Sequence, residues 1–202
     1  MNLKEHPEFV PVIEWWEKDG KQIVITLAIA LVAFGGFKGI QAHRASVKVA
    51  ASDALVSAYT TEEIENAVSK FGGEASGGVL KLRLAKSYYD AGSYDAALAQ
   101  YEEAAKGELN GFEAIPVVGK AQCLEAMGKA DEALAAFDAF VSENPKSYLT
   151  LTAQLGGARC LAAKGDKDGA LARLAALKET DDELAKARVE ATEALVKRFV
   201  AK

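Results

Sequence analysis

The chain has 202 residues, of which half are hydrophobic, 8% are aromatic and four are proline. Many alanines and few prolines favour an all-helical fold, because alanine has the best helix propensity and proline the worst. The formal net charge of −5 arises beyond residue 48, since residues 1–48 hold six Lys and Arg against five Asp and Glu. This acidic balance argues against a nucleic-acid partner, which needs a clustered positive face.

An uncharged run of fifteen residues, 23–37, lies between Lys21 and Lys38. As a helix it spans about 22 Å, which is shorter than the ~30 Å hydrocarbon layer of a membrane. The two lysines can extend toward the headgroups on their long stems, and the Trp15–Trp16 pair can lie at the interface. We therefore predict one transmembrane helix over residues 22–42.

A cleaved signal peptide and a buried core helix are the alternatives for this run. A signal peptide should begin with a short positive segment, whereas residues 1–21 hold three lysines against five acids and no clear A-x-A site follows. A core helix is possible at this length, yet the run is apolar on every face. Lysine and arginine number three on each side, so charge does not set the orientation.

Helical periodicity continues from the anchor through residues 38–58, and Thr60 or Thr61 can cap a second helix over residues 62–70. These two helices are predicted to form an introductory hairpin, and a glycine-rich joint completes a connecting region over residues 43–78. The joint has the glycine spacing of a phosphate loop. It lacks the Lys and Ser or Thr that such a loop needs, so nucleotide binding is not expected.

Three glycines, Gly92, Gly128 and Gly165, lie 36 and 37 residues apart, and each ends the first helix of one repeated pattern. A small residue precedes each glycine where two helices cross, and large residues follow in the second helix. This pattern resembles the tetratricopeptide repeat, which has a period of about 34 residues. Residues 79–202 are therefore predicted to form an α-solenoid of three hairpins, closed by a helix over residues 181–200. The excess length is expected in longer loops around 107–113 and 142–149.

The reactive side chains of the sequence do not form a catalytic pattern. Cys123 and Cys160 occupy equivalent repeat positions, roughly 10 Å apart by the spacing of packed helices, so we expect two buried, unpaired cysteines. His6 and His43 lie outside the repeats, which leaves no Ser-His, Cys-His or histidine-metal set in the soluble part. No enzyme activity, cofactor, metal or small-molecule substrate is expected.

The first helices of such repeats usually line a concave face. One equivalent position on them holds hydrogen-bond donors, the position four residues earlier holds aliphatic side chains, and two further residues lie one turn later. In that order these are Lys86, Gln122 and Arg159; Leu82, Val118 and Leu155; and Tyr89 and Glu125. With the cationic side chains exposed, this ridge would suit an extended or helical peptide. The alternative is an ordinary helix face divided between core and solvent.

The whole layout, from short acidic N-terminus through apolar segment and exit helix to degenerate repeats, resembles the YfgM-like family of bacterial membrane proteins. The most specific stretch is Val79–Ala104. The resemblance implies a single-pass inner-membrane protein with its repeats in the periplasm, acting as an ancillary subunit of the Sec translocon. Its implied partners are translocon subunits, periplasmic chaperones or nascent chains. A scaffold for envelope assembly or cell division would use the same hairpins and is the alternative.

Overall fold

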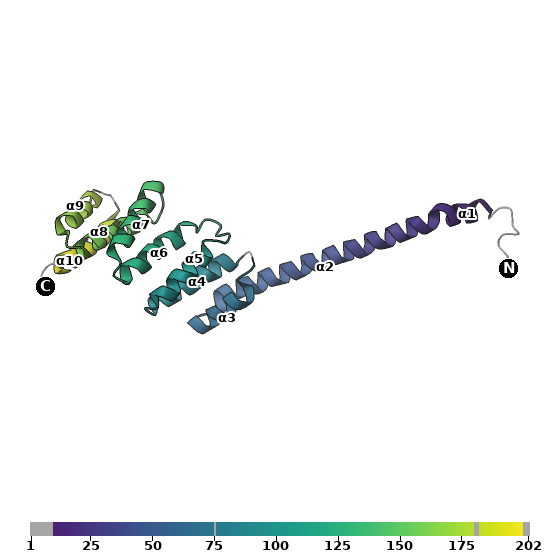
Figure 1. The fold of residues 1–202 in the computed structure, drawn as a ribbon, viewed down its shortest axis with the longest axis horizontal. Coiled ribbons are helices and arrows are strands. Elements are labelled where there is room, and N and C mark those ends of the chain that lie inside the picture. The colour runs from purple at the N-terminus through teal and green to yellow at the C-terminus, as the bar shows by residue number, and fades with distance from the viewer. Residues whose placement is uncertain (1–9, 75, 180–181, 200–202) are drawn as a thin grey trace. The chain divides into compact units, whose positions relative to one another are not determined.

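A computed structural model describes residues 10–74, 76–179 and 182–199, and these ranges consist of helices and short connections (Figure 1). His6 and both ends of the expected closing helix, at residues 181 and 200, lie outside the described residues. The chain divides into two compact units between Val49 and Ala50.

The first unit is helical from Val10 onward. Helix α1 (Val10–Trp15) passes through one π-helical turn (Trp16–Gly20) into α2 (Lys21–Ser57), which contains the apolar run and residues 38–57 in one continuous helix. The helical stretch Val10–Ser57 is long and apolar enough to cross a membrane, and none of its most apolar window is buried inside the protein. Exposure of that window argues against a core helix and leaves the anchor and the signal peptide.

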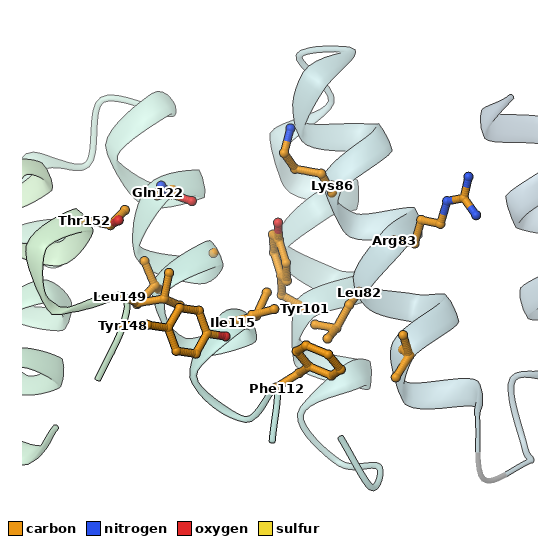
Figure 2. Close-up of a pocket in the computed structure, with 13 residues that line it drawn as sticks. Leu82, Arg83, Lys86, Tyr101, Phe112, Ile115, Gln122, Tyr148, Leu149 and Thr152 are labelled. Carbon is orange, nitrogen blue, oxygen red and sulfur yellow. The ribbon is translucent and has the colours of Figure 1, made fainter. Parts of the chain in front are cut away.

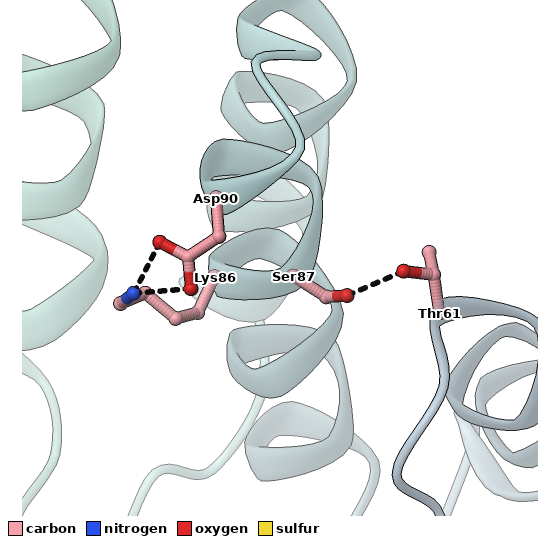
Figure 3. A network of polar contacts seen from close by, with 4 residues as sticks. All are labelled: Thr61, Lys86, Ser87 and Asp90. Carbon is pink, nitrogen blue, oxygen red and sulfur yellow. Dashed lines mark hydrogen bonds and ion pairs between the residues drawn. The ribbon is translucent and has the colours of Figure 1, made fainter.

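Helix α3 (Thr61–Phe71) begins with a capping box at Thr60. The Thr60 hydroxyl accepts from the N–H of Glu63 at 3.2 Å, and the Glu63 carboxylate accepts from the N–H groups of Thr60 and Tyr59 at 3.0 and 2.8 Å. These backbone hydrogen bonds, from Thr60 first and Tyr59 second, lower the pKa of Glu63. Thr61 is thus not the cap. Its hydroxyl instead lies 2.6 Å from that of Ser87 (Figure 3).

The predicted solenoid of three hairpins and a closing helix is confirmed. Within each hairpin the two helices pack together, and the second helix also packs against the first helix of the next hairpin. The closing helix packs against both helices of the third hairpin (Figure 1). In chain order the elements are α4 (Gly77–Asp90), α5 (Tyr94–Ala104), α6 (Ala114–Ala126), α7 (Ala130–Glu143), α8 (Thr150–Ala163), α9 (Lys167–Leu177) and α10 (Glu183–Phe199).

The turns within the hairpins depend on Gly92, Gly128 and Gly165, whose φ angles are +77°, +77° and +90°. Residues that carry a side chain rarely adopt these positive φ angles, which explains why a glycine recurs at the end of each first helix. The connections between hairpins, at residues 105–113 and 144–149, are longer than these turns, as the repeat period predicts.

Two aromatic rings fix the contacts between successive hairpins. Tyr101 of α5 lies against Gly119 of α6, and Phe137 of α7 lies against Gly156 of α8. A Cβ atom built at either glycine would come within 2.5 Å of the facing ring. Tyr101 is 3% exposed and Phe137 is fully buried. The absence of a side chain at each glycine lets the ring pack directly on the helix backbone.

Both cysteines are buried and unpaired, as expected. Cys123 lies in the core between the first two hairpins, and Cys160 in the core between the second and third. Burial raises the pKa of Cys123 to about 11 and that of Cys160 to about 12. Both thiols therefore stay protonated at neutral pH and serve as small core residues.

We predict that Gly119→Ala destabilises the repeat unit. Alanine is the better helix former by up to about 1 kcal/mol, but forcing a methyl group into the Tyr101 ring costs about 1–3 kcal/mol. The net effect should be a lower midpoint in chemical denaturation. Gly73→Ala, in the turn after α3, is the control for the added methyl group, because its Cβ would meet nothing within 4 Å. An unchanged midpoint for Gly119→Ala would show that the ring does not constrain this position.

The Glu193 carboxylate of α10 should make folding sensitive to acid. It accepts from Lys178, just after α9, at 2.5 Å and from Lys197 at 2.6 Å. These hydrogen bonds, from Lys178 first, lower its pKa from 4.5 to about 2. The stabilisation is therefore present above pH 4.5 and is lost as the pH falls toward 2. Glu193→Gln should flatten the fall of the unfolding midpoint in this window, whereas Glu190→Gln, at an exposed position of α10, should not. Parallel profiles for wild type and Glu193→Gln would contradict this.

Candidate functional site

A groove of about 470 Å³ lies between α4 and α6 and reaches the first turn of α8 (Figure 2). Leu82 of α4 and Val118 of α6 contribute to its floor and are 6% and 1% exposed. The Tyr101 ring, held against Gly119, completes the floor. The ring–glycine contact at this junction therefore also shapes the groove.

The two longer loops each supply an aromatic side chain to the groove. Phe112 precedes α6 and Tyr148 precedes α8, 36 residues apart, so they occupy equivalent positions of the repeat. They are 46% and 63% exposed, which is high for large side chains of this kind. In Figure 2 both rings lie at the same end of the groove, beside Leu82 and Ile115.

Polar groups gather at the other end of the groove. Figure 2 shows Lys86 and Gln122 at this end, and the Tyr101 hydroxyl points toward it. Lys86 Nζ lies 2.5 Å from Asp90 Oδ1, and the two side chains are 63% and 59% exposed (Figure 3). An ion pair this exposed contributes little to stability, so Lys86 is available to other partners.

A second cation approaches this end from the closing helix. The Arg188 guanidinium of α10 donates to the Thr152 hydroxyl at 2.9 Å, and Thr152 lines the groove. Arg83 lines the groove as well, but its guanidinium turns away and donates to the carbonyl of Leu55. None of the described residues that line the groove is an Asp or a Glu.

Half of the sequence-predicted residues line this groove, and the other half do not. Leu82, Lys86, Val118 and Gln122 are brought together there. Tyr89 instead packs beside Tyr94, with ring centroids 5.3 Å apart.

The third repeat does not extend the ridge, because the closing helix covers it. Leu155 is 3% exposed and belongs to the core formed with Val189 and Val196 of α10. All three members of the predicted aliphatic row therefore belong to the core, and only Leu82 and Val118 also line the groove.

The expected exposure of Arg159 is wrong. Its guanidinium forms two hydrogen bonds to the Glu125 carboxylate, at 2.5 and 2.7 Å, which join α8 to α6. The two side chains are only 27% and 21% exposed, and they line a separate cavity of about 510 Å³. Burial alone would lower the pKa of Arg159, but the hydrogen bonds and charge of Glu125 outweigh it and raise the pKa. Arg159 thus joins two hairpins of the stack and does not line the groove.

Sequence reasoning missed the two loop aromatics, Phe112 and Tyr148. A signal was present, because the loops around residues 107–113 and 142–149 were identified as insertions and both rings recur at the repeat spacing. Only the fold shows that the two loops contribute to the same groove.

The lining of the groove is suited to docking of a protein segment. Within residues 10–74, 76–179 and 182–199, no three His, Cys, Asp or Glu side chains gather where they could hold a metal ion. The side chains of the groove are apolar, aromatic or hydrogen-bonding groups, which suit a peptide segment.

Repeated hairpins with glycine turns and a groove along the first helices define a helical repeat protein of the tetratricopeptide class. Residues 14–191 match the family described as tetratricopeptide repeat-like domain, and the chain belongs to that family. Repeat domains of this type are generally non-catalytic scaffolds for protein–protein interaction. No curated protein and no solved structure matches the chain.

We predict that Arg159→Gln destabilises the repeat unit by about 1–2 kcal/mol. Breaking a fully buried pair costs about 3–5 kcal/mol, and partial exposure of this pair reduces that cost. Lys164→Gln is the matched control, because the Lys164–Asp131 pair also joins successive hairpins but is 38% and 83% exposed. The control should change the free energy of unfolding much less, because solvent screens this exposed pair. Equal losses in the two variants would mean that burial of the Glu125–Arg159 pair is not what matters.

Proposed function

We propose that this protein is a membrane-tethered scaffold that holds a segment of a protein partner in the groove between α4 and α6. The observation that carries the proposal is the pair of exposed aromatic side chains, Phe112 and Tyr148, beside an apolar floor. Large apolar groups that stay exposed around a concave surface are typical of interaction sites. The groove also has hydrogen-bonding groups at one end, which can orient a bound peptide.

The apolar helix before the repeats supports the tether. Residues 22–42 cross the inner membrane once in this proposal, with residues 1–21 in the cytoplasm and the repeats in the periplasm. A tether confines the repeats to the membrane surface and raises their effective concentration near other membrane proteins. The orientation rests on the resemblance to the YfgM-like family, as do the translocon subunits, periplasmic chaperones or nascent chains proposed as partners.

Site-specific photo-crosslinking in native membranes tests this function. A photoreactive amino acid at Gln122 places the probe in the groove, whereas the same amino acid at Ala139, an exposed position on α7, serves as the control. We expect ultraviolet light to produce adducts from position 122 that are absent from position 139. Mass spectrometry should identify a translocon subunit, a periplasmic chaperone or an exported chain in them.

The crosslinked partner separates the possible outcomes. If the crosslinked partner is an enzyme of envelope assembly or division, the protein is still a scaffold, but its role lies in that process and not at the translocon. Identical adducts from both positions, or none from either, would contradict docking in the groove.

A further inference from the structure

We infer that the segment held in the groove is apolar at one end and acidic at the other. Its apolar side chains are clamped between Phe112 and Tyr148, and its carboxylates lie toward Lys86 and Arg188. This inference rests on the proposed function and specifies the chemistry of the partner.

The apolar end follows from the two loop aromatics. Phe112 and Tyr148 come from different connections between hairpins, yet both line one groove and both are substantially exposed to solvent. A side chain placed between them would remove apolar surface from water on two sides, with Ile115 and Leu82 beneath it. An aliphatic or aromatic residue fits this position, and a charged residue would be desolvated there without a partner.

The acidic end follows from the distribution of charge. Lys86 and the Arg188–Thr152 pair bring two cationic side chains from α4 and α10 toward the polar end, and the part of the chain that the structure describes contributes no acid to the groove lining. Asp90 is the acid that faces Lys86, and their ion pair is open to solvent. A carboxylate of the partner can therefore share Lys86 with Asp90, or take the place of Asp90 beside Lys86, at little cost in free energy. The chain has a formal net charge of −5, so its overall charge does not attract an acidic segment, and the cationic groups at this end would have to hold one.

The size of the groove limits the occupant to a short stretch. Its volume of about 470 Å³ lies within the range of roughly 300–1,000 Å³ typical of pockets that enclose small ligands. A few side chains of an extended or helical segment fill such a space. An acidic group within about one helical turn of an apolar anchor is the pattern expected in the partner.

Peptide binding to the full chain in detergent micelles tests the inference. Three fluorescent peptides would share one apolar half rich in Leu, Ile and Phe, and would differ in a second half of Glu, Gln or Lys. Fluorescence anisotropy should rank their affinities Glu above Gln above Lys. We expect steps of about two- to fivefold, typical of exposed charge pairs. Raising the salt from about 0.05 to about 0.5 M should compress the ranking by screening.

Two sets of variants separate the charge from the clamp. The double variant Lys86→Gln, Arg188→Gln should bind the Glu and Gln peptides with equal affinity, and its affinity for the Gln peptide should equal that of the wild type. The double variant Phe112→Ala, Tyr148→Ala should bind all three peptides about tenfold more weakly, as expected on loss of aromatic anchors. Tyr59→Ala is the matched control, because this tyrosine is 80% exposed and does not line the groove. Circular dichroism checks that each variant keeps its helicity.

Failure of this inference can be told from failure of the proposed function. Equal affinity for the three peptides, lost in the Phe112→Ala and Tyr148→Ala variant, would overturn the acidic preference and leave docking in the groove intact. Unchanged affinity in that aromatic variant would overturn both. If no peptide binds, the inference is overturned, and the crosslinks from position 122 decide the function independently.

Discussion

The contact between an aromatic ring and a helical glycine is the constraint on which the stack depends. Glycine in the middle of a helix is unfavourable by about 1 kcal/mol relative to alanine, so two such residues need a compensating contact. Tyr101 and Phe137 provide it by packing on Gly119 and Gly156, which brings each hairpin close to the next. At the first of these junctions the same ring forms part of the groove floor. Packing and the candidate site therefore have one physical origin.

The third hairpin and the contact between α6 and α8 differ from the first junction, and this explains why the groove lies between α4 and α6. In the third hairpin the position of the ring is occupied by Leu174, which packs against Val189 and Val196 of α10. The closing helix thus buries the face that would otherwise continue the groove. Between α6 and α8 the Arg159 guanidinium, which was expected to face a ligand, donates instead to the Glu125 carboxylate. An apolar surface with the hydrogen-bonding groups of Lys86 and Gln122 at one end remains between α4 and α6.

Much of the fold was predictable because its signals are local. Positive φ after each first helix requires glycine, and the Thr60 capping box needs residues only three apart, so hairpin limits follow from short stretches of sequence. The candidate site was only partly predictable. Repeat equivalence placed Leu82, Val118, Lys86 and Gln122 on one face, but it treated the third repeat as identical. Whether Leu155 is covered and Arg159 is paired depends on α10 and Glu125, whose packing no single repeat encodes.

Hydrogen–deuterium exchange on the full chain, alone and saturated with the Glu-containing apolar peptide, tests most directly whether the groove is the docking surface. The account predicts slower exchange in the loops at residues 105–113 and 144–149 and in the facing turns of α4 and α6. Amides of α7 and α9, which do not line the groove, should exchange at the same rate with and without peptide. Protection confined to those helices, or centred on the cavity beside Glu125 and Arg159, would contradict the account.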